Sequence, residues 1–87
     1  MKHATSVALD ELEPLLAALR ATPGLKEKSR GVFYRRSKAF LHFHEDPAGL
    51  FADVRNDTGD FDRFAVRDAE EQGALLSLVV QRLTDAV

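Results

Sequence analysis

The fold is decided by residues 32–55, which read VFYRRSKAFLHFHEDPAGLFADVR. Three runs rich in aromatic and aliphatic residues alternate here with two short polar segments, and the runs cover residues 32–36, 39–44 and 50–55. We interpret the runs as strands, because such residues favour strands and turn-forming residues bound them. The first polar segment, Ser37 and Lys38, has the length of a tight hairpin turn, and the second contains Pro47 and Gly49.

Alternation along these strands predicts two faces, since successive side chains of a strand point to opposite sides of a sheet. The predicted core face consists of Val32, Tyr34, Leu41, Phe43, Leu50, Ala52 and Val54. The predicted opposite face consists of Phe33, Arg35, Phe40, His42, His44, Phe51, Asp53 and Arg55. Several phenylalanines on a face open to water would form an apolar patch, which monomers avoid unless something binds there. We therefore predict that this face binds a ligand or partner. A bulge or one-residue slip is the alternative, since it would move some rings into the core.

The rest of the chain predicts a helix on either side of the strands. Asp10 and Glu13 have the spacing of a capping box, and four leucines that follow share one helical face. A fourth strand is predicted at residues 61–67, and Asp68 and Glu71 repeat the capping-box spacing at the start of a final helix. Residues 25–30 fit either an edge strand or an extended loop.

These elements predict an α+β fold in which helix, four strands and helix follow one another. We expect two layers, with a four-stranded antiparallel meander and both helices packed on one sheet face. At 87 residues the chain is expected to be one domain, with residues 1–9 as a candidate mobile segment.

Composition limits the function classes. The chain has no Cys, a net charge of −2, no apolar run long enough to cross a membrane and no signal-peptide pattern. We therefore expect a cytoplasmic protein without a membrane partner, and no cofactor is predicted. Six basic residues nevertheless lie within residues 26–38, which predicts a local basic patch.

His42 and His44 are the candidate metal ligands, because residues two apart on a strand point to the same side. Asp53 on the adjacent strand is the candidate third ligand, with Glu45 and Asp46 as alternatives at the strand end. His3 is set aside because it lies in the candidate mobile segment. No metal site is assigned from the sequence alone.

No catalytic residues are predicted, although His42 or His44 could serve in acid–base chemistry because imidazole titrates near neutrality. Cys is absent, and no serine has a local signature of an activated nucleophile. The sequence therefore favours a binding module over an enzyme, with a metal-dependent enzyme built on His42, His44 and Asp53 as an alternative.

Two macromolecular partners are candidates for the aromatic and arginine-bearing face. A homodimer would bury the rings where two such faces meet, with Arg55 pairing with Asp53 of the partner. A single-stranded nucleic acid would stack its bases on the rings and pair its phosphates with Arg35, Arg55 and Arg63.

The segment from Thr22 to Arg55 resembles the MmcQ/YjbR-like family of small bacterial proteins. The resemblance rests on Pro23-Gly24-Leu25 after a helix, an aromatic strand, Lys38 and Phe40 after a tight turn, and the alternating strand at 50–55. It implies a compact α+β fold in a family described as DNA-binding. A weaker resemblance, to a small luciferase-type domain, rests on Pro23-Gly24 and the His42-x-His44 pair. Neither resemblance supplies catalytic residues.

Overall fold

The chain folds into helices and one antiparallel sheet, which confirms the predicted α+β class. The structure is a computed structural model that describes residues 2–85. Its elements, in chain order, are β1 (Lys2–His3), α1 (Ser6–Glu11), α2 (Glu13–Arg20), β2 (Lys26–Ser29), β3 (Val32–Arg35), β4 (Lys38–Asp46), β5 (Gly49–Arg55), β6 (Phe61–Ala65) and α3 (Ala69–Asp85). No helix within residues 2–85 is both long and apolar enough to cross a membrane.

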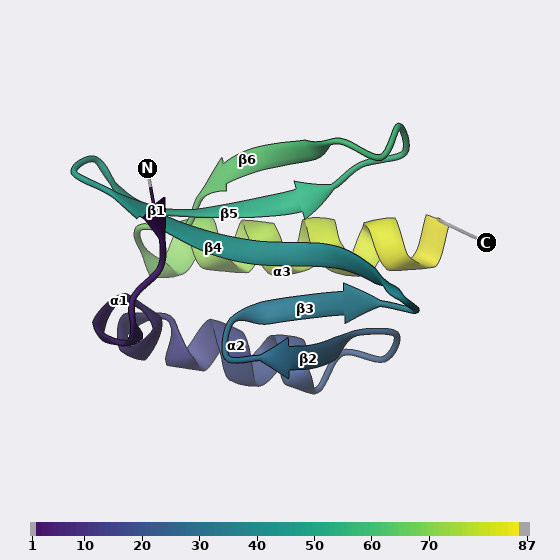
Figure 1. Cartoon of the computed structure of the whole chain (residues 1–87), viewed down its shortest axis with the longest axis horizontal. Helices are drawn as coiled ribbons and strands as arrows, with labels where there is room; N and C mark the ends of the chain where they lie inside the picture. The colour runs from purple at the N-terminus through teal and green to yellow at the C-terminus, as the bar shows by residue number, and fades with distance from the viewer. Residues whose placement is uncertain (1, 86–87) are drawn as a thin grey trace.

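The sheet is larger than the four strands that the sequence predicts. Five consecutive strands lie in the order β2-β3-β4-β5-β6, and β1 pairs with β4 (Figure 1). Residues 26–29 therefore form the edge strand that was one of two predictions for this segment. β4 has nine residues and β3 has four, so β3 covers only the first part of β4. The backbone at the end of β4 near Asp46 would otherwise have no strand beside it on that edge. β1 pairs with that end, at His44 and Glu45, so residues 2–9 contribute β1 and part of α1.

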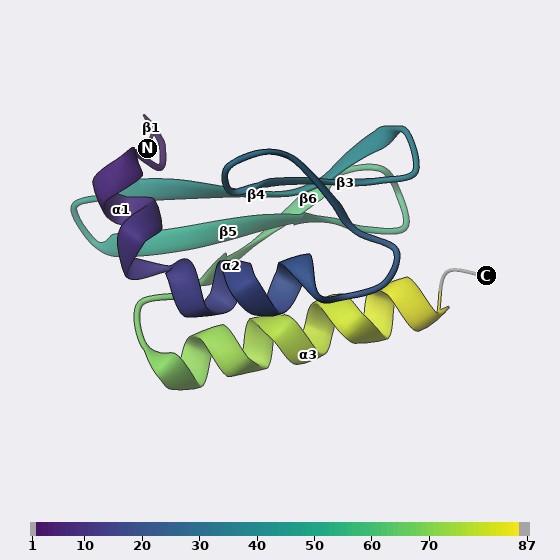
Figure 2. The same cartoon turned by 90° about the horizontal axis from the view of Figure 1, so that it is seen from below.

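The hydrophobic core lies between the sheet and the helices. α2 and α3 lie side by side on one side of the sheet, and α1 packs at its end near β1 (Figure 2). α2 contributes Leu15, Leu16 and Leu19, and α3 contributes Leu75 and Val79. The strands contribute Phe33, Phe40, Leu41, Phe43, Ala52 and Val54. Both helices direct their apolar residues toward the same layer, and no helix of residues 2–85 covers the opposite face of the sheet (Figure 2).

A bulge in the β3–β4 hairpin corrects the predicted faces. Phe33 pairs with Leu41 and Tyr34 pairs with Ala39, so Phe40 is an extra residue on β4. Phe33 is 0% exposed and Phe40 is 4% exposed, and both belong to the core. The prediction that both lie on the open face was wrong, because the bulge interrupts the strict alternation of side chains along β4. Tyr34 was predicted in the core and is half-buried outside it, with the Lys28 ammonium 5.4 Å from its ring centre.

The hairpin loop also differs by one residue from the prediction. β3 ends at Arg35 and β4 begins at Lys38, so the loop is Arg36–Ser37 instead of Ser37–Lys38. Arg36 has a φ of 58°, which L residues other than Asn and Asp rarely adopt. This one-residue difference shifts the pairing of the two strands and contributes to the exchange of faces described above.

The first helical segment begins earlier than predicted. Thr5 is the N-cap of α1 and its side chain accepts a hydrogen bond from the Ala8 amide, whereas Asp10 lies inside the helix. The helix breaks at Leu12, and Pro14 occupies the first turn of α2, where its missing amide hydrogen is not needed. At α3 the prediction was correct, because Asp68 accepts a hydrogen bond of 2.8 Å from the Glu71 amide.

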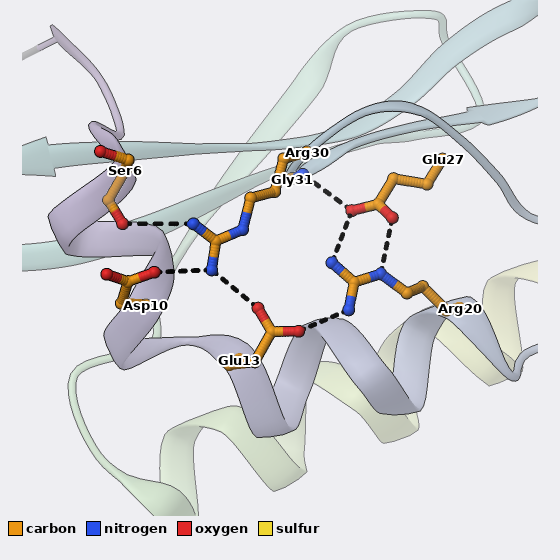
Figure 3. Close-up of polar contacts among 7 residues, drawn as sticks. All are labelled: Ser6, Asp10, Glu13, Arg20, Glu27, Arg30 and Gly31. Atoms are coloured by element: carbon orange, nitrogen blue, oxygen red, sulfur yellow. Dashed lines mark hydrogen bonds and ion pairs between the residues drawn. The ribbon is translucent and has the colours of Figure 1, made fainter.

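A network of ion pairs ties the helices to the edge of the sheet (Figure 3). Arg20 of α2 binds Glu27 of β2 through two nitrogens and also binds Glu13. Arg30, in the turn between β2 and β3, binds Glu13 and Asp10. These contacts join α1 and α2 to β2 and to the turn that follows it.

Candidate metal site

The open face of the sheet brings three histidines together. His3 of β1 pairs across the strands with His44 of β4, and His42 lies two residues before His44 on the same side. The ring centroids of His3 and His44 are 4.7 Å apart, those of His42 and His44 are 4.9 Å apart, and those of His3 and His42 are 5.8 Å apart. One ring nitrogen from each histidine lies within 4.8 Å of the others. We call His3, His42 and His44 the histidine cluster.

A buried carboxylate lies beneath the histidine cluster. Asp53 of β5 pairs across the strands with His42 and is 6% exposed. Arg63 of β6, its partner on the other side, binds both carboxylate oxygens, with Nε–Oδ1 and Nη2–Oδ2 distances of 2.8 and 2.9 Å. Burial alone raises the pKa of Asp53, but the hydrogen bonds and positive charge of Arg63 outweigh burial and lower that pKa overall. Asp53 is therefore a fixed negative charge beside the imidazoles.

Two imidazole nitrogens face this carboxylate without a hydrogen bond. Nδ1 of His44 lies 3.2 Å from Asp53 Oδ2, and Nδ1 of His42 lies 4.0 Å from the same oxygen. Both Nδ1 atoms are buried, and neither has an aligned hydrogen-bond partner among residues 2–85. Such buried unsatisfied atoms are uncommon in native proteins, and each requires an explanation.

Burial determines the charge state of the two half-buried histidines. Loss of hydration lowers the pKa of His42 and of His44, and the opposing attraction of Asp53 does not fully compensate. The neutral imidazole is thereby favoured at neutral pH, and neutral imidazole is the form that coordinates metal ions.

The geometry suits a transition-metal ion. A tetrahedral zinc ion with Zn–N distances of about 2.0–2.1 Å requires nitrogens about 3.4 Å apart, so shifts of about 1 Å would close the cluster around it. Because the Nδ1 atoms of His42 and His44 face Asp53, their Nε2 atoms are the nitrogens available to an ion. A carboxylate that accepts the other ring N–H is a recurrent feature of histidine metal sites, where it fixes ring orientation.

An aromatic ring forms one wall of the cluster. The Phe61 ring of β6 lies 4.9 Å from the His42 ring and is 37% exposed. Arg55 is the cross-strand partner of Phe61, and its guanidinium lies 4.8 Å from the centre of the Phe61 ring. Apolar atoms beside the imidazoles reduce the access of water, which strengthens electrostatic interactions there.

The structure brings together some of the residues predicted for the site and separates others. His42, His44 and Asp53 are neighbours, Phe51 pairs with His44, and Arg55 lies further along β5 on the same face. Phe33 and Phe40 are in the core instead, and Arg35 lies at the hairpin end of β3. The alternative metal ligands are engaged elsewhere, since Glu45 accepts the Thr5 amide and Asp46 accepts the Ala48 amide.

His3 is the site residue that sequence analysis excluded. Its position near the start of the chain suggested mobility, and a two-residue strand has too short a pattern to be recognised. Only the long-range pairing of β1 with β4 places its ring beside His44.

The contacts of Asp53 bear on the predicted homodimer. Asp53 binds Arg63 of its own chain, while Arg55 donates hydrogen bonds to the Ala39 and Gly59 carbonyls. Both side chains of the predicted Arg55–Asp53 contact between two copies are therefore already bound within one chain. Phe33 and Phe40 are buried, so two of the rings that favoured a homodimer are not on the open face.

Comparisons with protein-family models, with curated proteins and with solved structures find no match to this chain.

Proposed function

We propose that this protein is a binding module that holds a divalent transition-metal ion, zinc above all, between His3, His42 and His44. The single observation that carries the proposal is the convergence of three imidazole nitrogens within 4.8 Å on one sheet face. The proposal keeps the open face as the functional surface that the sequence predicts and identifies its ligand.

The surroundings of the histidine cluster support the proposal. Neutral imidazoles do not repel a cation, and Asp53 supplies a negative charge within 3.2 Å of His44 Nδ1. A bound ion would withdraw electron density from each ring and favour Nδ1–H bonds to Asp53, which the present ring orientations do not align. This role accounts for the two buried Nδ1 atoms, which otherwise have no aligned partner within residues 2–85.

The ligand set indicates the class of metal. Imidazole suits zinc, copper, nickel and iron, whereas magnesium and calcium prefer oxygen ligands. Three protein ligands also leave a fourth position for water or another small ligand, in contrast to closed structural zinc sites with four protein ligands.

Metal titration tests the proposal directly. The purified chain, stripped with EDTA, is titrated with ZnCl₂ by calorimetry, and its melting temperature is followed with Zn²⁺, Ni²⁺ and Mg²⁺. At a hundredfold excess of Zn²⁺ over Kd, binding stabilises the folded state by about 2.7 kcal/mol. For a domain of this size that corresponds to a rise in Tm of about 10–20 °C. Mg²⁺ is expected to leave Tm unchanged.

Variants of the cluster distinguish a specific site from loose surface binding. His3→Ala, His42→Ala and His44→Ala should each remove most of the zinc-dependent shift. Lys2→Ala is the matched control, because it alters the same short strand without removing an imidazole. Asp53→Asn keeps the shape of the side chain and should weaken binding by about 10–100-fold. A zinc shift that survives all three histidine variants, or no shift with any transition metal, refutes the proposal.

A metal-dependent enzyme is a second candidate, favoured by the three-histidine set. Zinc sites with three protein ligands and an open position are typical of catalytic zinc, which lowers the pKa of its bound water to about 7. Hydrolysis of an activated ester by the zinc-loaded chain, lost in His44→Ala, would favour this candidate. Zinc binding without turnover would favour the binding module.

A further inference from the structure

A second site lies at the other end of the sheet from β1. Here the β3–β4 loop, the residues that follow β5 and the last turns of α3 enclose a pocket of about 460 Å³. Its lining residues are Arg35, Arg36, Ser37, Lys38, Phe40, Arg55, Asn56, Asp57 and Arg82. We call it the basic pocket. Its volume lies within the range of about 300–1,000 Å³ that is usual for small-molecule sites.

The basic pocket concentrates positive charge in a protein whose net charge is −2. Five of its nine lining residues are Arg or Lys, and Asp57 is the one acidic residue among the nine. The side chains of Arg36 and Lys38 are exposed and form no hydrogen bond or ion pair within the described part of the chain. Uncompensated cations around a concave surface create a positive potential that attracts anions.

Two guanidinium groups of the basic pocket are held in fixed positions. Arg55 donates from Nε to the Ala39 carbonyl at 2.6 Å and from Nη1 to the Gly59 carbonyl at 2.9 Å. Carbonyl oxygens orient a guanidinium without cancelling its charge, so Arg55 is a preorganised cation. Arg82 is similarly bound to the Val54 carbonyl at 3.3 Å, although Asp62 offsets part of its charge. Preorganised donors lose less entropy when they bind a ligand.

The hairpin loop keeps a cation where its backbone favours glycine. Arg36 is the first residue of the two-residue loop and has a φ of 58°. Glycine adopts this conformation without steric conflict, whereas an L side chain is strained. Strain of this kind often marks functional positions, where a side chain is needed despite the backbone.

We propose that the basic pocket binds a small phosphorylated metabolite. Arg and Lys pair with phosphate oxygens through charge-assisted hydrogen bonds, and the Ser37 hydroxyl provides a further donor. The volume exceeds what one inorganic phosphate fills, so the ligand carries an organic part in addition. The proposal is independent of the metal site, because no residue of the histidine cluster lines the basic pocket.

Calorimetry with adenosine monophosphate as the probe tests this inference. The full chain is measured at low salt in the presence of EDTA, so that metal binding cannot contribute. The double variant Arg36→Ala/Lys38→Ala should weaken binding by about tenfold or more, because each removed cation loses a charge-assisted contact. The double variant Lys26→Ala/Lys28→Ala is the matched control. It removes the same charge from exposed residues of β2 outside the pocket and should change affinity by less than about twofold.

Further probes show which part of the nucleotide the basic pocket binds. Adenosine, which lacks the phosphate, should not bind, and inorganic phosphate should bind more weakly than the nucleotide. Equal loss of affinity in both double variants would mean general charge attraction and would overturn the proposal. So would a short single-stranded oligonucleotide that binds while the mononucleotide does not, since the pocket would then be part of a nucleic-acid surface. Absence of binding by every probe would overturn it as well.

Discussion

Replacement of Phe40 by Ala should destabilise the protein far more than replacement of Phe51 by Ala. Phe40 is 4% exposed and packs in the core, whereas Phe51 is half-buried on the open face. Truncating a buried Phe costs about 3–5 kcal/mol through lost transfer energy and the cavity left behind. Full burial of such a side chain contributes about 1.5–3 kcal/mol, so a half-buried ring should cost about 1 kcal/mol.

These magnitudes are large relative to the whole free energy of unfolding. At about 0.05–0.15 kcal/mol per residue, a chain of this length has a free energy of unfolding of about 4–13 kcal/mol. Urea denaturation followed by circular dichroism measures both variants, and an m-value of about 1 kcal/mol/M places the Phe40→Ala midpoint about 3–5 M lower. Phe40→Leu retains an apolar side chain and gives a measurable midpoint even where Phe40→Ala does not fold.

The comparison tests the bulge itself. With strict alternation along β4, Phe40 would share the open face with His42, and its truncation would be about as mild as that of Phe51. Equal midpoints for the two Ala variants, or a larger effect for Phe51→Ala, would refute the assignment of Phe40 to the core.

Three further predictions concern the framework that positions the two sites. Gly73→Ala should raise the free energy of unfolding by about 1 kcal/mol in urea denaturation, because a methyl group there meets no atom within 4 Å in an exposed helix interior. An unchanged or lower midpoint would contradict this. Gly31→Ala should instead lower the midpoint, since φ is 79° and the new methyl group would lie 2.7 Å from Leu9 Cδ2; a neutral effect would show that α1 does not pack on this turn. Glu27→Gln should destabilise the protein mainly above about pH 4.3, the ordinary pKa of Glu. The hydrogen bonds from Arg20 lower the pKa of Glu27, so its contribution is complete above that value and is lost as the pH falls through the lower folded-state pKa. A difference between wild type and variant that stays constant from pH 6 to about pH 3 would contradict the coupling.

The sequence predicts the strands better than it predicts their register. β4, β5 and β6 follow from runs of aromatic and aliphatic residues between turn residues, and Asp68 identifies the start of α3. The bulge at Phe40 leaves no such pattern, because Phe40 and Leu41 are both apolar and either could face the core. Local sequence therefore determines that strands exist here, while side-chain packing across the sheet decides which face each residue occupies.

Two of the three histidines of the cluster were predictable, because regular alternation applies to that part of β4. His42 and His44 lie beyond the bulge, where alternation holds, and their cross-strand partners Asp53 and Phe51 follow from regular pairing of β4 with β5. His3 depends on a contact between residues 41 positions apart, for which a two-residue strand has no pattern in the sequence. Arg63 likewise was assigned to the fourth strand, but its two bonds to Asp53 depend on the register of β6.

The bulge at Phe40 connects the core with both proposed sites. By turning Phe40 inward, it fills the core under the hairpin and leaves β4 to resume alternation with His42 and His44 on the open face. The extra residue also lies where β4 emerges from the hairpin loop, whose cations Arg36 and Lys38 line the basic pocket together with Phe40. Without the extra residue, Tyr34–Ala39 and Phe33–Leu41 would become consecutive pairs, and the regular pairing of β4 with β5 would still hold His42 and His44 on the open face beside Asp53. A deletion of Phe40 should therefore lower stability, because a core ring is lost, while zinc binding persists; His42→Ala should abolish zinc binding alone, as measured by calorimetry and urea denaturation. Loss of zinc binding in a deletion variant that still folds would show that the histidines depend on this irregularity for their common face.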